Sequence, residues 1–223
     1  MSFSIPEGEK NRLAFYAKLG ISADNVVSAG LVHGSAVAVV GKTGLKRIPS
    51  KDALISRETG TYLALTIGDC LPLFLHDKKA HMVALVHAGW RSIAQNILAK
   101  TLERMESLGS AAKNIEMVVG PGIGPCHYRF NAKRIEALNE DPKDAEMFKK
   151  LSTYKDAFAT TGGETAIDLR KIVKAQFIKL GGVEKNVTMS DLCTFCEAEK
   201  FFSYRREKNT PPNTMIAIIG LKR

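Results

Sequence analysis

The chain of 223 residues lacks any apolar run that approaches the roughly 18 residues of a membrane-spanning helix. Its opening stretch, MSFSIPEGEKNR, has neither a basic start nor an apolar core, so a secretory signal peptide is not predicted. We therefore expect a cytoplasmic protein that does not bind a membrane.

Cysteine, histidine and aromatic residues are all scarce. Four cysteines in a chain this long do not indicate a disulfide framework, and in a reducing compartment such residues are buried thiols, metal ligands or nucleophiles. Aromatic residues make up 7%, and no basic run is interleaved with them, so nucleic acid is not a predicted partner despite a net charge of +9. Lysine and arginine are spread along the chain, which is typical of a solvated surface, although the charge would also attract a phosphorylated substrate.

Internal repeats, low-complexity tracts and Pro/Ser-rich linkers are missing too, so residues 1–223 are predicted to form a single domain. The patterns predict helices at residues 8–20, 92–108, 131–151 and 168–180, and strands within residues 25–41, 61–77, 81–89, 114–120, 200–207 and 214–222. Strands come early and late, with helices between them. This order predicts an α+β or α/β fold with mixed β-sheets flanked by helices.

Cys70 and His87 lie 17 residues apart, each at the mouth of a predicted strand, and the short turn HDKKAH joins the two strands. A hairpin can bring its far ends together, and therefore the thiol and the imidazole. His33, which precedes a glycine at a strand bend, is the natural third donor. Two histidines and one cysteine would leave one tetrahedral position open, as in a catalytic zinc site. A Cys–His nucleophile pair, or a buried thiol with structural histidines, would fit the spacing as well.

Three further motifs carry weaker signals. The loop GPGIGP at residues 120–125 has Pro125 where a dinucleotide fingerprint needs its third glycine, so a Rossmann site is not predicted. Cys193 and Cys196 form a lone C-x-x-C, which we interpret as structural thiols because a second such pair is missing. Cys126 and His127 are adjacent, so in an extended segment their side chains would point to opposite faces.

Two arginine motifs are candidates for anion binding. Arg91 lies at the start of the predicted helix that follows His87, where both its charge and the helix N-terminus favour an anion. The stretch FFSYRRE ends in Tyr204, Arg205 and Arg206, and consecutive arginines form either a solvated edge or a clamp for phosphate. On the strand predicted here, Tyr204 and Arg206 would share one face and Arg205 would take the other.

The segments NRLAFYAKLGI, VHGSAV, DALIS, LTIGDCLPLFLHD, ALVHAGWRS, VVGPGIGPCHYRF, IDLRKI and CTFCEAEKFFSYRRE occur in this order over nearly the whole chain. Together they resemble the YfiH-like laccase-domain family, whose members also carry the names polyphenol oxidoreductase, peptidoglycan editing factor and purine nucleoside phosphorylase. The resemblance implies a YfiH-like fold and a zinc site formed by His33, Cys70 and His87, with copper as the alternative metal.

The resemblance also implies a small-molecule enzyme: phosphorolysis of adenosine, inosine or methylthioadenosine, and deamination of adenosine. Cys70, His87, Arg91 and Asp52 are then the expected catalytic residues, with Asp52 either orienting a ligand histidine or acting as a base. Phosphate or substrate would bind Arg91, with Tyr204 and Arg205 as further candidates.

Other hypotheses are a hydrolase of cell-wall precursors that uses Cys70 as nucleophile, and a non-catalytic zinc-stabilised binding domain. Phenol oxidation is not expected, because three N/S ligands for one metal do not form a multi-copper cluster.

The sequence departs from the family pattern at three places. A strand segment that family members carry before the NRLAFYAKLGI helix is missing, which leaves the oligomeric state open. Leu31 replaces the glutamine of Q-x-H-G and removes a polar group beside the expected site. Ser92 stands where glycine is common, at the start of a helix.

Overall fold

The computed structural model describes residues 6–41, 47–208 and 210–222. The described strands form sheets with the orders β13-β5-β1-β3, β10-β11-β9 and β12-β8-β6-β7-β4-β2. The strands are β1 (Val26–Gly30), β2 (Val37–Val39), β3 (Arg47–Pro49), β4 (Ala53–Ser56), β5 (Tyr62–Ile67), β6 (Leu71–Asp77), β7 (Met82–Ala88), β8 (Ile115–Val119), β9 (Arg129–Asn131), β10 (Phe158–Thr161), β11 (Glu164–Ile167), β12 (Val187–Met189) and β13 (Met215–Gly220). The helices are α1 (Pro6–Lys18), α2 (Trp90–Ala94), α3 (Ile97–Glu106), α4 (Ala132–Glu140), α5 (Pro142–Leu151), α6 (Leu169–Lys179) and α7 (Tyr204–Glu207).

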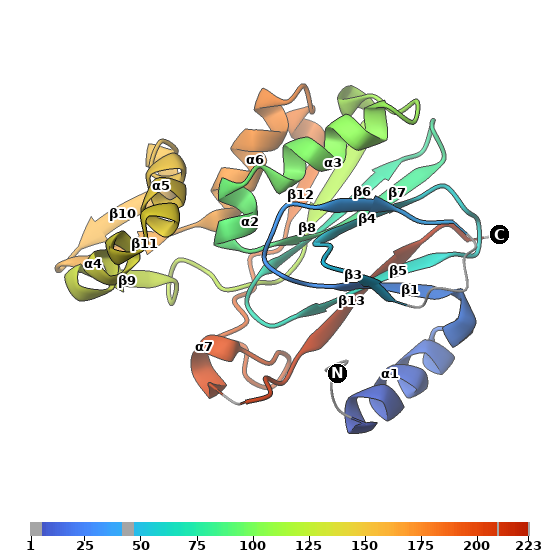
Figure 1. Cartoon of the computed structure of the whole chain (residues 1–223), viewed down its shortest axis with the longest axis horizontal. Helices are drawn as coiled ribbons and strands as arrows, with labels where there is room; N and C mark the ends of the chain where they lie inside the picture. Colours follow the sequence, from blue (N-terminus) through green and yellow to red (C-terminus); the bar gives the residue numbers. More distant parts are fainter. Residues whose placement is uncertain (1–5, 42–46, 209, 223) are drawn as a thin grey trace.

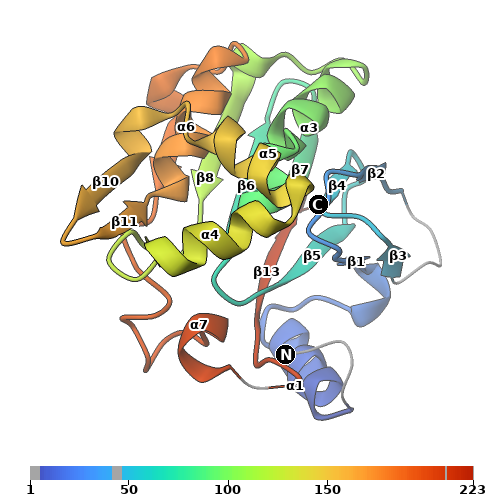
Figure 2. The ribbon, with the colours of Figure 1, turned by 60° about the vertical axis from the view of Figure 1, so that its left-hand side comes forward.

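The elements stack in layers. Helices α2, α3 and α6 cover one face of the six-stranded sheet, and the four-stranded sheet packs against its other face, with α1 on the outside (Figure 1). Helices α4 and α5 and the strands β9, β10 and β11 form a lobe at one end of these layers (Figure 1), which comes forward in Figure 2. The predicted fold class, a mixed α/β domain with helices flanking mixed sheets, is confirmed.

The strand β7 lies at the centre of the molecule, and all seven of its residues are buried. Met82, Ala84 and Val86 face the helices, whereas Val83 and Leu85 face the four-stranded sheet. A strand covered on both faces needs a nearly continuous apolar sequence. Burial of each large side chain contributes about 1.5–3 kcal/mol, so the strand that carries His87 is held firmly.

Two predicted elements are wrong. The single helix expected at residues 92–108 is divided into α2 and α3, because Asn96 adopts a left-handed conformation with φ of 61°. The strand expected at residues 200–207 is instead irregular and ends in the short helix α7. The buried Ser203 hydroxyl accepts a hydrogen bond from the Arg206 N–H, which starts this helix and removes the strand faces expected for Tyr204 and Arg206.

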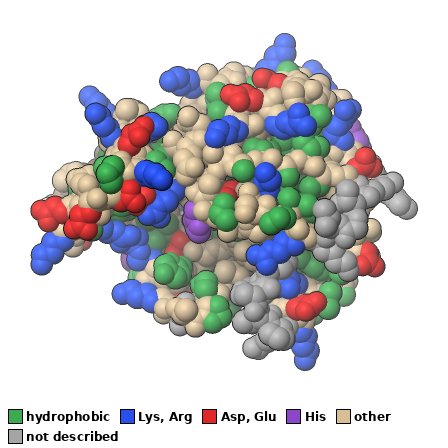
Figure 3. All heavy atoms as spheres, in the orientation of Figure 1, with side chains coloured by type: hydrophobic (Ala, Val, Ile, Leu, Met, Phe, Trp, Pro, Cys, Tyr) green, Lys and Arg blue, Asp and Glu red, His purple; other side chains and the backbone are tan. Residues whose placement is uncertain are grey.

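One face of the molecule carries the mixed charge expected of a solvated surface. Lysine and arginine side chains are scattered across the face seen in Figure 3, with acidic side chains between them. Among the described residues, no helix is both long enough and apolar enough to cross a membrane.

Candidate metal centre

The hairpin predicted to join Cys70 and His87 is present. Strands β6 and β7 pair antiparallel, with Leu71 opposite Ala88 and Pro72 opposite His87. Cys70 directly precedes β6, so its thiol lies beside the end of β7. The metal-binding atoms of His33, Cys70 and His87 all lie within 4.8 Å of one another. The structure therefore brings together the trio that the sequence predicted as a metal site.

A buried carboxylate holds the loop that carries His33. Asp52, just before β4, accepts hydrogen bonds from the backbone N–H groups of Val32 (3.2 Å), His33 (2.9 Å) and Gly34 (2.9 Å). The loop wraps around this carboxylate, which explains why His33 takes the left-handed conformation with φ of 56°. Its side chain remains exposed, at the edge of the trio.

The same carboxylate fixes the ring of His87. His87 Nδ1 lies 2.8 Å from Asp52 Oδ1, and both side chains are almost fully buried. Because a carboxylate accepts, Nδ1 carries a proton, and Nε2 faces the Cys70 thiolate, where a metal would displace the Nε2 proton. Burial raises the pKa of Asp52, but hydrogen bonds from His87 and from the Gly34 and Val32 N–H groups outweigh it, so the pKa is lowered and the carboxylate stays charged. Of the two roles predicted for Asp52, this geometry favours orientation of a histidine.

The electrostatics prepare Cys70 as a ligand. Burial raises the pKa of the Cys70 thiol, but the charge of His87 and hydrogen bonds from His33 and His87 bring it down to about 6. Burial lowers the pKa of His87, whereas the Cys70 thiolate and the Asp52 carboxylate raise it to about 9. A cysteine with a lowered pKa is a thiolate at neutral pH, which is the form that binds metals.

Gly89 leaves room for the three metal-binding side chains because glycine has no side chain. A Cβ atom on Gly89 would lie 2.9 Å from Cys70 Sγ and 3.4 Å from His33 Cδ2. The donor set of two imidazoles and one thiolate suits zinc or copper and leaves a coordination position open. The residues present thus fit a metal with an accessible face.

Asp69, which was not predicted as a site residue, connects the metal-binding corner to the segment that contains Thr194 and Arg205. Asp69, with φ of 99°, accepts hydrogen bonds from Thr194 Oγ1 (2.6 Å) and from the Arg205 N–H (2.7 Å). It precedes Cys70, so these bonds bring the segment around Arg205 to the metal-binding corner. The D-C-L-P motif contains this residue, but the strained backbone that aims its carboxylate is not visible in the sequence.

Basic side chains line the adjoining surface. The Arg205 guanidinium lies 5.6 Å from the centre of the buried Tyr128 ring, and Arg134 stacks on Phe130. The Tyr128 and Phe130 rings lie 5.0 Å apart, so the two guanidinium groups are neighbours; burial lowers the pKa of Arg134 and the charge of Arg205 lowers it further. Arg134 was missed in the sequence because it lies in a helix with an ordinary surface pattern.

Arg91 has a partner that the sequence did not reveal. Its guanidinium forms a two-pronged ion pair with Asp144 of α5, with a Nε–Oδ1 distance of 2.9 Å, and stacks on Trp90. The predicted role of Arg91 in binding phosphate therefore stays a prediction. The exposed side chain of Tyr204 projects from α7, and its predicted role is equally open.

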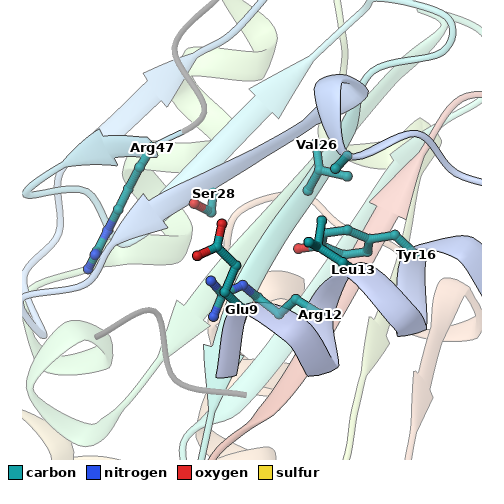
Figure 4. Close-up of a pocket in the computed structure, with 8 residues that line it drawn as sticks. Glu9, Arg12, Leu13, Tyr16, Val26, Ser28 and Arg47 are labelled. Carbon is teal, nitrogen blue, oxygen red and sulfur yellow. The ribbon is translucent and has the colours of Figure 1, made fainter. Parts of the chain in front are cut away.

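A separate hollow of about 170 Å³ lies between α1 and the four-stranded sheet. Figure 4 shows Glu9 and Arg12 of the helix facing Ser28 of β1, with Arg47 of β3 nearby. None of the predicted site residues lines it.

The layered α/β fold and the corner of two histidines and one cysteine define a domain with a candidate metal-binding site. The chain belongs to the family described as multi-copper polyphenol oxidoreductase laccase, whose model matches residues 7–222. The hypothetical protein YfiH of Bacillus licheniformis has a similar structure, with a TM-score of 0.82 and 27% identity over 96% of this chain and 80% of that one. YlmD of Geobacillus stearothermophilus gives a TM-score of 0.81 and 28% identity over 96% and 79% of the two chains.

Related sequences carry enzyme names. The purine nucleoside phosphorylase YlmD of Geobacillus stearothermophilus is 29% identical over 94% of this chain and 77% of its own length. The purine nucleoside phosphorylase Cgl2154/cg2365 of Corynebacterium glutamicum is 32% identical over 90% and 76%. Adenosine deaminase RL5, from an unknown prokaryotic organism, is 28% identical over 87% and 75%. The word laccase enters only through the description of the family.

Proposed function

We propose that this chain is a zinc-dependent purine nucleoside enzyme of the cytoplasm that phosphorolyses adenosine, inosine or methylthioadenosine and deaminates adenosine. The observation that carries the proposal is the corner of His33, Cys70 and His87, with His87 locked by the buried Asp52 and His33 open to solvent. The names of the related purine nucleoside phosphorylases and of adenosine deaminase RL5 give the substrate class.

His33, Cys70 and His87 would hold a zinc ion, which would supply Lewis acidity to a bound substrate. Asp52 keeps a proton on Nδ1 of His87, so Nε2 is the atom that would bind the metal, and the thiolate of Cys70 contributes negative charge. Copper would fit the same donors, but phenol oxidation by several coppers needs more ligands than this corner contains.

The basic surface is assigned to phosphate. In phosphorolysis a phosphate oxygen bonds to the anomeric carbon of the ribose as the glycosidic bond breaks, and the base leaves with a proton. The backbone of Arg205 binds Asp69 beside Cys70, and the guanidinium groups of Arg205 and Arg134 lie over the neighbouring rings of Tyr128 and Phe130, so these two positive charges would hold the phosphate dianion against the ribose. The charge of Arg91 is paired with Asp144, so phosphate would bind Arg91 only by competing with that carboxylate.

Deamination uses water in place of phosphate. Water adds at C6 of adenine and ammonia leaves, so this reaction needs no phosphate. The exposed ring of Tyr204 can stack on a purine, and this contact would serve both reactions.

The test is chromatography of products formed from adenosine, with and without phosphate, by metal-replete protein. Adenine that forms only with phosphate establishes phosphorolysis, and inosine that forms without it establishes deamination. Cys70→Ala should abolish both, whereas the control His76→Ala, in the outer part of β6, should abolish neither. Untouched adenosine would refute the assignment for this substrate, and untouched inosine and methylthioadenosine as well would refute the nucleoside assignment. Rapid alkylation of Cys70 together with cleavage of cell-wall peptides would favour a cysteine hydrolase instead.

A further inference from the structure

A second group of metal-binding side chains lies outside the site described above. The donor atoms of Cys126, His127, Cys193 and Cys196 all lie within 4.8 Å of one another. They come from two distant loops, one after β8 and one after β12. We propose that these four residues form a second metal centre, a closed tetrahedral site for zinc. This inference does not depend on the proposed function.

Cys126 and His127 were expected to point to opposite faces only in an extended segment, and the segment is not extended. The N–H groups of His127 and Tyr128 both donate to the Gly124 carbonyl, at 3.1 and 2.9 Å, and fold residues 124–128 into a turn. The turn lets adjacent side chains converge. The interpretation of the C-x-x-C as purely structural thiols overlooked the donors that this turn supplies.

The distances suit a metal. Cys126 Sγ lies 3.6 Å from Cys196 Sγ, and Cys196 Sγ lies 3.3 Å from His127 Nδ1. Tetrahedral zinc, with Zn–S bonds of about 2.3 Å and Zn–N bonds of about 2.0 Å, separates two sulfur ligands by about 3.8 Å and sulfur from nitrogen by about 3.5 Å. A disulfide would join only two of the thiols and would not explain why the other two donor atoms also converge there.

The loops hold the donors in place. The Gly124 N–H donates to Cys193 Sγ at 3.2 Å, and the backbone N–H groups of Phe195 and Cys196 also face this sulfur. Such bonds stabilise a thiolate, as second-shell groups do around metal ligands. The His127 ring stacks on Phe195 at a centroid distance of 3.9 Å, which fixes the direction of its Nδ1.

An arginine holds the loop of the second centre closed. Arg206 donates to the carbonyls of Thr194 and Phe195, both at 2.8 Å, within the C-x-x-C loop itself. These two bonds hold the C-x-x-C loop closed, and the charge of Arg206 is paired with Glu207 at 3.0 Å.

The second centre would also support the first. Thr194, between the two cysteines of the C-x-x-C, donates its hydroxyl to Asp69, which precedes Cys70 and also binds the Arg205 N–H. A metal that fixes the C-x-x-C loop thereby fixes the segment that brings Arg205 to the candidate active site. All four of its ligands come from the protein, so the second centre has no position for substrate and its role is structural.

Elemental analysis of zinc-loaded protein should find two zinc ions per chain. Cys70→Ala and Cys196→Ser should each retain one. Cobalt loading distinguishes the two remaining ions, since charge transfer from thiolate to cobalt scales with the number of thiolates: Cys70→Ala should keep the stronger band and Cys196→Ser the weaker. His127→Gln should weaken binding of the second ion, whereas His76→Gln should leave it unchanged.

A second measurement works on the wild-type chain, in case the variants do not fold. Cys126 and Cys196 are exposed thiols, so alkylation mapped by mass spectrometry should be fast after chelation and slow in the zinc-loaded protein. Equal alkylation rates in both forms would overturn the proposal. One zinc ion per chain that disappears in Cys70→Ala would overturn it, as would a disulfide between Cys126 and Cys196 in protein kept under reducing conditions.

Discussion

Replacement of Asp52 by asparagine tests how the first metal centre is built. Each carboxylate oxygen accepts two N–H groups: Oδ1 takes His33 N and His87 Nδ1, and Oδ2 takes Val32 N and Gly34 N. The amide NH₂ of asparagine must replace one of these oxygens, so it faces two donors and two hydrogen bonds are lost. At about 1.5–3 kcal/mol for each bond to a charged acceptor, Asp52→Asn should cost about 3–6 kcal/mol of unfolding free energy.

Metal affinity should fall together with stability. Without the carboxylate, the proton of His87 is free to move to Nε2, which removes one metal ligand. Loss of such a supporting carboxylate weakens metal binding by about 10–100-fold. Urea unfolding of the chelated protein would measure the first effect, and competition with a chromophoric chelator would measure the second.

Asp77, at the outer end of β6, offers the matched control. It is also fully buried, and it accepts hydrogen bonds from Ser110 Oγ (2.6 Å) and from the N–H groups of Ala80 (2.9 Å) and Ala111 (3.4 Å). Asp77→Asn should destabilise the fold by about 1–3 kcal/mol and leave metal affinity unchanged. If Asp52→Asn bound metal as tightly as wild type, the role assigned to Asp52 would be refuted.

Three other expectations can be checked separately. Gly89→Ala places a carbon 2.9 Å from Cys70 Sγ and should displace the first metal, seen as lost zinc in elemental analysis, whereas Gly68→Ala, with its nearest contact at 3.5 Å, should not. Arg205→Ala should raise the KM for phosphate about tenfold or more without changing the zinc content, because it removes charge-assisted bonds to phosphate; an unchanged KM would remove it from the phosphate site. Burial raises the pKa of Asp77, but hydrogen bonds from Ser110 and Ala80 lower it overall. The charged carboxylate therefore adds to the free energy of unfolding above a pH of about 4. That stabilisation is lost as the pH falls through the pKa of Asp77 in the folded protein. Urea unfolding should therefore show that the difference in unfolding free energy between wild type and Asp77→Asn shrinks in acid. A difference that does not change with pH would contradict this.

The hairpin was predictable because a local pattern sets it, whereas the full trio with His33 was implied by the resemblance to the family. Two apolar runs around a polar turn pair in one way, and the pairing places Cys70 beside His87. Buried residues along β7 alternate between two packed layers, which the sequence also indicates.

Features that depend on single backbone angles or on distant loops were not predictable. The left-handed Asn96 interrupts an otherwise regular helical pattern. The Ser203 cap changes an apolar segment that resembles a strand into the start of a helix.

The second group of donors shows the same limit most clearly. Cys126 and Cys196 stand 70 residues apart, and their meeting depends on how two loops cross. Adjacent residues such as Cys126 and His127 can share a site only where the chain turns, and the turn is fixed by hydrogen bonds to Gly124.

Reconstitution with zinc tests the central claim most directly. Chelated protein is titrated with zinc while adenine and inosine formed from adenosine are measured in the presence of phosphate. We expect no turnover without metal, recovery as zinc fills the site of His33, Cys70 and His87, and none at any zinc concentration for Cys70→Ala. Turnover by the chelated protein equal to that of the reconstituted protein would contradict the assignment.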